Sequence, residues 1–326
     1  MLKKALYWEK TGENIRCLLC PHFCIILDNE QGKCRKRINN KGVLYTNNYS
    51  FTTSLNLDPL EKKPLYHFFP TEEVLSLGSN SCNLSCKFCQ NYTISQFDCP
   101  VIQLSPDDLV KLCLEKSIKH VAFTYTEPFT WFEYILDAIK VLRYNNISTI
   151  LVTNGYVNQE PLIEIISYIS AMNIDLKAYS NSFYQDICGG NLQPVLNTIE
   201  YSYNKTHVEI TLLLIENLND NPDELNKLFK FIGNLNKNIP LHISKYFPRY
   251  LLKSKETSEN ALLKAVKIAK NYLNFVYVGN LRSDYSNTYC PQCQDLLIKR
   301  QDYNTKILGL NKGICSKCQF PIIAPF

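Results

Sequence analysis

The sequence predicts an α/β protein whose body is a partial (β/α)6-type TIM barrel, flanked by a small cysteine-rich N-terminal cap and a four-cysteine C-terminal tail. Short apolar strands alternate with helical stretches over residues 71–287, which is the pattern of βαβ units and a parallel sheet. The alternation stops on both sides, and cysteines gather in both flanks. The 326 residues are 45% hydrophobic, enough for a sizeable core. We therefore divide the chain into a cap and linker (1–70), a barrel (71–287) and a metal-binding tail (288–326).

The elements of the barrel can be placed in order along the chain. The predicted strands are 74–77, 120–124, 148–153, 174–176, 207–214, 241–244 and 275–278. The predicted helices are 105–117, 132–144, 159–170, 194–203, 222–234 and 258–273. Ser105 followed by Pro106 marks a helix start. Breakers such as Asp58-Pro59 predict irregular structure over residues 41–73. In such a barrel, chemistry lies at the carboxyl ends of the strands.

The cysteine content indicates metal binding in a reducing compartment. No apolar run approaches the roughly 18 residues of a membrane helix, and residues 1–16 lack the apolar stretch of a signal peptide, so we expect a cytoplasmic protein. Disulfides do not persist there, and cysteine-rich cytosolic chains usually bind metal. Most of the fourteen cysteines fall into three groups with the spacing of metal ligands. The net charge is +5, and the basic residues are scattered along the chain apart from a CRKR cluster, so a nucleic-acid surface is not indicated.

The central group is Cys82, Cys86 and Cys89, with C-x3-C-x2-C spacing directly after the first predicted strand. Three thiolates are too few to ligate all four irons of a [4Fe–4S] cluster, so one iron would keep an open site for a cofactor or substrate. By spacing alone, a zinc site with a distant fourth ligand is an alternative. The position at the mouth of a barrel favours a cofactor site.

Polar residues lie at the ends of four later strands of the barrel, and each also has a structural interpretation. Glu127 could cap a helix, Thr153 and Asn154 could form a plain turn, and Asp175 with Lys177 could be a structural ion pair. A lone histidine such as His242 is usually structural as well. Because strand ends of a parallel barrel meet at one rim, we expect these side chains to form one pocket with the central cysteines. They are Glu127, Thr153, Asn154, Asp175, Lys177 and His242.

The central motif, with the aromatic Phe88 before its last cysteine, resembles the signature of the radical S-adenosylmethionine (SAM) superfamily. The resemblance implies that the open iron of a [4Fe–4S] cluster chelates SAM, donates one electron and yields a 5′-deoxyadenosyl radical that abstracts hydrogen. Tyr125-Thr126-Glu127-Pro128 stands where that family has a G-G-E-P motif, which implies that Glu127 meets the SAM amino group. Two glycines are replaced here, so the backbone contacts of that motif are not carried over.

The same resemblance implies roles for the other strand-end residues. Thr153 and Asn154 would be further SAM contacts. Asp175 and Lys177 resemble the D-x-K motif of glycyl-radical activating enzymes, which lies by the SAM carboxylate or methionine moiety. His242 would approach the SAM ribose.

Longer strings narrow the resemblance. CLLCPHFC, DPLEKKPLYHFFP, LGSNSCNLSCKFCQNYTISQ, NIDLKAYSNSFY and LHISKYFPRY resemble the radical SAM member of the AmmeMemoRadiSam system, which is similar to pyruvate formate-lyase activating enzyme. The resemblance implies an electron donor such as flavodoxin or ferredoxin, AMMECR-type and Memo-type partners, and a protein substrate. A small-molecule or nucleotide substrate is the alternative, and a metal-stapled adaptor without catalysis is an alternative of another class.

The outer cysteine groups predict two further metal sites. Cys290, Cys293, Cys315 and Cys318 form two C-x2-C knuckles of zinc-ribbon or rubredoxin type, for which a structural Zn²⁺ is expected and a one-electron relay is the alternative. The cap group could close a zinc site or an auxiliary [4Fe–4S] cluster, with His22 as a substitute ligand; its members are Cys17, Cys20, Cys24 and Cys34. Residues 58–67 are dense in polar groups, and we hypothesise that they lie at the open face, where Lys63 would contribute to the substrate site.

Overall fold

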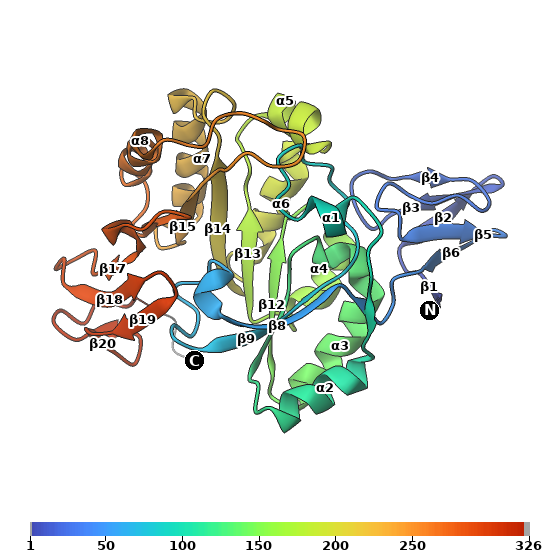
Figure 1. Cartoon of the computed structure of the whole chain (residues 1–326), viewed down its shortest axis with the longest axis horizontal. Helices are drawn as coiled ribbons and strands as arrows, with labels where there is room; N and C mark the ends of the chain where they lie inside the picture. Colours follow the sequence, from blue (N-terminus) through green and yellow to red (C-terminus); the bar gives the residue numbers. More distant parts are fainter. Residues whose placement is uncertain (1, 323–326) are drawn as a thin grey trace.

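A mostly parallel sheet of eight strands forms the centre of the computed structural model, which describes residues 2–322 (Figure 1). Its order is β16-β15-β14-β13-β12-β11-β9-β8, and only β8 runs antiparallel to its neighbour. The strands are β8 (Ser54–Pro59), β9 (Glu73–Gly78), β11 (His120–Phe123), β12 (Ser148–Thr153), β13 (Ala171–Asp175), β14 (His207–Leu214), β15 (Leu241–Lys245) and β16 (Val276–Gly279). The seven predicted strands are therefore confirmed as one parallel set.

Helices connect successive parallel strands, as the sequence predicted. They are α2 (Pro106–Glu115), α3 (Phe132–Tyr144), α4 (Gln159–Ile166), α6 (Leu192–Ser202), α7 (Pro222–Leu235) and α8 (Glu259–Ala269), with the short helices α1 (Tyr92–Ser95) and α5 (Asn181–Phe183). Ser105 caps α2 through a reciprocal pair of hydrogen bonds with Asp108. Single-turn segments lie at Leu60–Lys62, Pro128–Trp131 and Asp284–Ser286, and a π-helical turn at Tyr184–Cys188.

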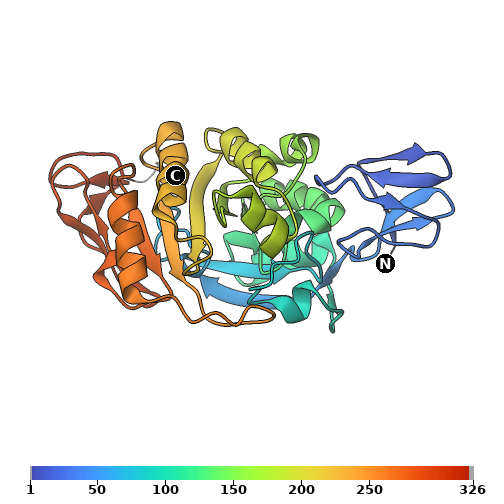
Figure 2. The ribbon, with the colours of Figure 1, turned by 90° about the horizontal axis from the view of Figure 1, so that it is seen from above.

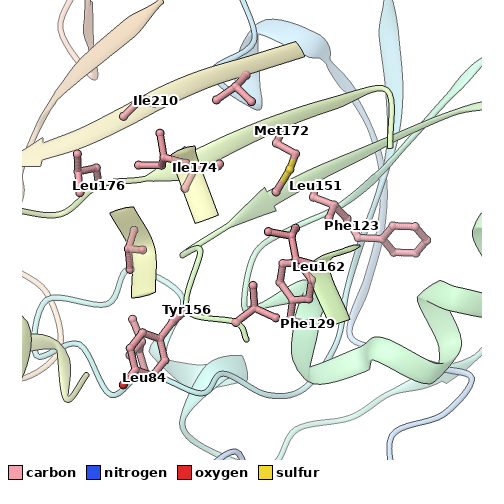
Figure 3. Close-up of a cluster of buried hydrophobic side chains, with 14 of the residues drawn as sticks. Leu84, Phe123, Phe129, Leu151, Tyr156, Leu162, Met172, Ile174, Leu176 and Ile210 are labelled. Atoms are coloured by element: carbon pink, nitrogen blue, oxygen red, sulfur yellow. The ribbon is translucent and has the colours of Figure 1, made fainter. Parts of the chain in front are cut away.

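The main core lies between the sheet and these helices. Side chains from four neighbouring strands gather there, including Phe123, Leu151, Met172 and Ile210 (Figure 3). Each such residue is buried, and full burial of one contributes about 1.5–3 kcal/mol. This packing fixes the strands side by side and so brings their carboxyl ends to one edge.

Residues 54–69 differ from the irregular linker that the sequence predicted. Ser54–Pro59 is strand β8, at the edge of the main sheet. The segment after β8 then packs its apolar side chains against the sheet's other face, where Leu60, Leu65 and Phe68 form a second core cluster with Val74, Ala122, Ile150 and Ala171. Both faces of the sheet are therefore covered at this point.

The cap and the tail lie at opposite ends of the molecule (Figure 2). The cap contains two three-stranded sheets, β1-β6-β5 and β2-β3-β4, and its last strand, β7, pairs with β10 (Ile102–Gln103) outside the cap. The strands of the cap are β1 (Lys3–Lys4), β2 (Trp8–Thr11), β3 (Asn14–Cys17), β4 (Ile25–Ile26), β5 (Arg37–Asn40), β6 (Val43–Thr46) and β7 (Phe51–Thr52). The tail contains β17 (Thr288–Tyr289), β18 (Leu296–Gln301), β19 (Asn304–Ile307), β20 (Leu310–Asn311) and β21 (Ile314–Cys315). Within residues 2–322, no helix has the length and apolar character needed to cross a membrane.

Candidate cluster site

Cys82, Cys86 and Cys89 lie on the loop that follows β9, at the carboxyl end of the strand. Two backbone hydrogen bonds fix this loop to the π-helical turn: Ser85 N donates to Cys188 O (2.9 Å), and Lys87 N donates to Ile187 O (2.9 Å). A further bond from Cys89 N to Cys86 O (3.1 Å) turns the loop back on itself. The cysteines therefore sit on backbone whose shape is fixed by its own hydrogen bonds.

Hydrogen-bond donors surround the sulfur atoms of this loop. Cys82 Sγ accepts from Leu84 N (3.4 Å) and Asn154 Nδ2 (3.6 Å), and Cys89 Sγ lies 3.3 Å from Ser95 Oγ. A contact from the neighbouring Cys188 thiol lowers the pKa of Cys86; burial opposes this shift and the Lys177 ammonium supports it. Donors and a cation near thiolates suit an anionic thiolate cluster.

The spread of the three sulfur atoms fits a cluster better than a single ion. Among residues 2–322, one group of three or more His, Cys, Asp or Glu residues has all its ligand atoms within 4.8 Å of one another. That group is the four tail cysteines, and it does not include the central three. The central cysteines are thus further apart than ligands of one zinc ion, whose sulfurs would be about 3.8 Å apart at a Zn–S bond of about 2.3 Å. The donor set and its spread fit a [4Fe–4S] cluster with three protein ligands.

Glu127 joins the ends of β11 and β12 beside this loop. Its buried carboxylate accepts from Thr153 Oγ1 (2.7 Å), Asn154 N (2.8 Å) and Phe129 N (3.0 Å). Burial raises the pKa of Glu127 to about 7, although the three donors oppose that shift. The bond to Phe129 N is the helix cap considered as the structural alternative, and the carboxylate also lies close enough to Cys82 to influence its thiol.

Asn154 connects Glu127 to the cysteine loop. Its Nδ2 donates to Asn83 Oδ1 (2.9 Å) as well as lying near Cys82 Sγ, and its Oδ1 accepts from Tyr156 N (2.8 Å). The structure therefore brings Thr153, Asn154 and Glu127 together at the cysteine loop, as expected from their positions at strand ends.

Asp175 and Lys177 form an ion pair at the end of β13, with Lys177 Nζ 2.7 Å from Asp175 Oδ2. Burial alone would lower the pKa of Lys177, but the charges of Asp175 and Cys86 outweigh it and raise that pKa well above its usual value. Lys177 Nζ also lies 5.9 Å from the centre of the Phe88 ring. The pair and Phe88 therefore lie beside the cysteine loop.

His242 does not lie where the sequence predicted. It is the second residue of β15, which continues to Lys245 because Ile243, Ser244 and Lys245 keep pairing with β14. The prediction that His242 ends its strand is therefore wrong. Its Nε2 lies 2.6 Å from Glu209 Oε2, and its ring stacks on Tyr277 with centroids 5.4 Å apart. The partners of His242 lie near the start of β15, on the face of the sheet that the segment after β8 covers.

Lys63 is buried, in contrast to the open-face location that we expected for its segment. Its Nζ lies 2.8 Å from Asp58 Oδ2 and 4.7 Å from the centre of the Tyr125 ring, and Tyr125 donates to the same Asp58 oxygen (3.1 Å). Asp58 pairs with Val74, at the end of β9 away from the cysteine loop. Tyr125 follows β11 and so links this ion pair to the rim.

Glu209 is a buried residue that the sequence analysis missed. It is fully buried and accepts hydrogen bonds from two histidines and from two backbone amides of the segment after β8. A charged residue within an otherwise apolar strand, two positions after His207, was the signal that could have identified it.

The tail cysteines form a compact four-sulfur site. Cys290 Sγ lies 3.4 Å from Cys318 Sγ, and Cys293 Sγ lies 3.6 Å from Cys315 Sγ. All four sulfurs fall within 4.8 Å of one another, so a single tetrahedral ion fits the set.

Comparison with known proteins agrees with this geometry. Residues 77–232 match the model of the Radical SAM superfamily. The chain is 38% identical over 322 residues to the uncharacterized protein MJ0808 of Methanocaldococcus jannaschii, covering 95% of each chain. It is 24% identical over 176 residues to the 4-hydroxyphenylacetate decarboxylase activating enzyme of Clostridium scatologenes, covering 47% of this chain and 53% of that protein. The part of the chain that carries the three central cysteines, residues 77–232, therefore matches the radical SAM superfamily.

A solved structure shows the same fold. Streptococcus suis SuiB bound to S-adenosylmethionine superimposes with a TM-score of 0.52 at 15% sequence identity, covering 64% of this chain and 52% of that one. At this identity the likeness concerns the fold alone.

Proposed function

We propose that this chain reductively cleaves SAM at a [4Fe–4S] cluster bound by Cys82, Cys86 and Cys89. The observation that carries the proposal is the convergence of the three thiols with Glu127, Asn154 and Lys177 at the carboxyl ends of neighbouring strands. Bound there, the cluster and SAM supply one-electron chemistry and a 5′-deoxyadenosyl radical. The test is anaerobic reconstitution with iron and sulfide, followed by measurement of 5′-deoxyadenosine under reducing conditions; a reconstituted protein that forms none contradicts the proposal.

The chain's own residues would bind and orient SAM. Glu127 offers a buried carboxylate for the SAM ammonium, while the Asp175–Lys177 pair offers a cation for its carboxylate. Asn154 Nδ2 and Leu84 N point at Cys82 Sγ and would stabilise the thiolate form that ligates iron.

The pKa of Glu127 predicts a pH-dependent affinity for SAM. Its pKa is raised to about 7, so the carboxyl group is mostly neutral below this pH and charged above it. We expect the Kd for SAM to fall as the pH rises through about 7, and Glu127→Gln to weaken binding and flatten this dependence, because only the carboxylate attracts the SAM ammonium. The measurement is SAM binding to the reconstituted protein between about pH 6 and about pH 8. Glu160→Gln, at an exposed position, is the control, and an unaltered pH profile in Glu127→Gln contradicts the assignment.

We favour action on a protein substrate, in the manner of an activating enzyme. Support comes from the Asp175–Lys177 pair and from the similarity to an activating enzyme of Clostridium scatologenes. This proposal includes a partly closed barrel, an electron donor of flavodoxin or ferredoxin type, and AMMECR-type and Memo-type partners. A glycyl-radical EPR doublet in a partner protein after incubation with SAM and reductant would support it, whereas deuterium transfer to 5′-deoxyadenosine only from small-molecule fractions would contradict it.

We also propose Zn²⁺ as the tail ion. Cys290 and Cys315 are fully buried in a small cluster with Leu297 and Ile298, so metal ligation and apolar packing stabilise the same unit. We expect Cys315→Ser to lose about one zinc per chain and to make residues 288–322 sensitive to proteolysis, since small metal-bound units fold with their ion. Metal analysis and limited proteolysis measure both effects. Lys317→Ser, at an exposed position two residues away, is the control; iron instead of zinc at this site would contradict the assignment.

A further inference from the structure

The four cap cysteines line one cavity. Cys17 ends β3, Cys20 and Cys24 lie on the loop before β4, and Cys34 precedes β5. All four line the same cavity, together with Arg37 of the cap and Asn83 of the central cysteine loop. They are free thiols, so the group is a set of four ligands in one place.

The cap sulfurs, unlike the tail sulfurs, do not form a group within the spacing of single-ion ligands. The tail sulfurs all lie within 4.8 Å of one another, whereas no three of the cap sulfurs do. A tetrahedral zinc site needs sulfurs about 3.8 Å apart. Four thiolates placed more widely around one cavity fit a [4Fe–4S] cluster, in which each thiolate binds a different iron.

Arg37 lines this cavity and carries a buried N–H donor that a sulfur acceptor would satisfy. Its side chain is 1% exposed, and its Nη2 is held by Glu133 Oε1 at 2.5 Å. Its Nε is buried and has no hydrogen-bond partner among residues 2–322. A buried donor left unpaired costs about 1–3 kcal/mol, so a cluster sulfur that accepts this N–H would remove that cost.

Two hydrogen bonds join the cap cysteines to the residues on either side of Cys82. Ser81 Oγ donates to Cys34 O at 2.8 Å. His22, which lies between Cys20 and Cys24, has its Nε2 2.7 Å from Asn83 O. Each link runs from a cap cysteine segment to a neighbour of Cys82 through one hydrogen bond and a few covalent bonds, which is a short route for an electron.

We propose that Cys17, Cys20, Cys24 and Cys34 bind a second [4Fe–4S] cluster that delivers electrons to the catalytic one. Four thiolates leave no open iron, so this cluster would transfer electrons without binding SAM. Bound there, it would supply one electron, taken from a low-potential donor of ferredoxin or flavodoxin type, to the catalytic cluster, where cleavage of one SAM to methionine and the 5′-deoxyadenosyl radical would consume that electron. The relay rests on the proposed SAM chemistry, whereas the presence of the cluster does not.

The presence of the cluster is tested without SAM. A variant with Cys82, Cys86 and Cys89 all replaced by serine cannot hold the catalytic cluster. After anaerobic reconstitution it should retain about four irons per chain, a [4Fe–4S] Mössbauer doublet and, when reduced, an EPR signal. The wild-type protein should contain about eight irons. Zinc in place of iron in the cap of the triple variant overturns the proposal, even if SAM cleavage by the wild-type protein succeeds.

The relay is tested in a Cys17→Ser/Cys20→Ser variant that keeps its catalytic cluster. We expect a loss of flavodoxin-driven 5′-deoxyadenosine formation relative to dithionite-driven formation, because a small reductant reaches the catalytic cluster directly. Cys99→Ser is the matched control. If the double variant fails to fold, rapid freeze-quench EPR of the wild-type protein replaces it, and the cap signal should appear before the catalytic one. An unaltered ratio of the two rates, or the reverse order of signals, overturns the relay.

Discussion

Replacing Cys86 by alanine should abolish SAM cleavage and remove about four irons per chain. Cys86 is buried at the centre of the loop, between the two other thiols and the contact with the π-helical turn. Two remaining thiolates cannot hold a cluster that has only three protein ligands. Iron analysis after anaerobic reconstitution and chromatography of 5′-deoxyadenosine measure the two effects.

Cys188 provides the sharpest control for this prediction. Its buried thiol lies against Cys86, but it is outside the C-x3-C-x2-C motif. Cys188→Ala should therefore keep the iron that Cys86→Ala loses, and Cys99→Ala should keep it as well. If Cys86→Ala still cleaves SAM, or if Cys188→Ala loses the iron instead, the assignment of ligands is wrong.

The strand and helix series could be predicted because it depends on local sequence. Ser148–Thr153 and His207–Leu214 have the predicted bounds, since apolar runs of this length, flanked by helical periodicity, form buried parallel strands. Strand β8 could not be predicted in the same way. Its sequence SLNLDP carries polar residues and a proline, and only pairing with β9 makes it a strand.

The candidate site shows the same division between local and long-range information. The central cysteines, Glu127 and Asp175 could be placed because each ends or follows a strand, and parallel strands end at one edge. His242 was misplaced because the end of β15 depends on how far its pairing with β14 continues. Glu209 was missed because its partners are Tyr66, His67, His207 and His242, and three of these lie more than 30 residues away along the chain.

Glu209→Ala should cause the largest loss of stability among single substitutions away from the cysteines. The carboxylate is fully buried and accepts from Tyr66 N (3.0 Å), His67 N (2.7 Å), His207 Nε2 (2.9 Å) and His242 Nε2 (2.6 Å). Alanine would leave these four donors without their acceptor. Removing one member of such a buried charged network costs about 3–5 kcal/mol. The measurement is the free energy of unfolding in denaturant under anaerobic conditions.

The pH dependence of stability supplies an independent test of the same network. Burial acts to raise the pKa of Glu209, but hydrogen bonds from His207 and His242 outweigh it and hold that pKa well below its usual value. A carboxyl group with a depressed pKa stabilises the folded state above its unfolded pKa, and this stabilisation is lost as the pH falls. Glu209→Ala should therefore lose less stability below about pH 4 than the wild-type protein does. The exposed Glu200→Ala should match the wild type in both measurements. A Glu209→Ala protein of wild-type stability would mean that the segment carrying Lys63 is held against the sheet by apolar packing alone.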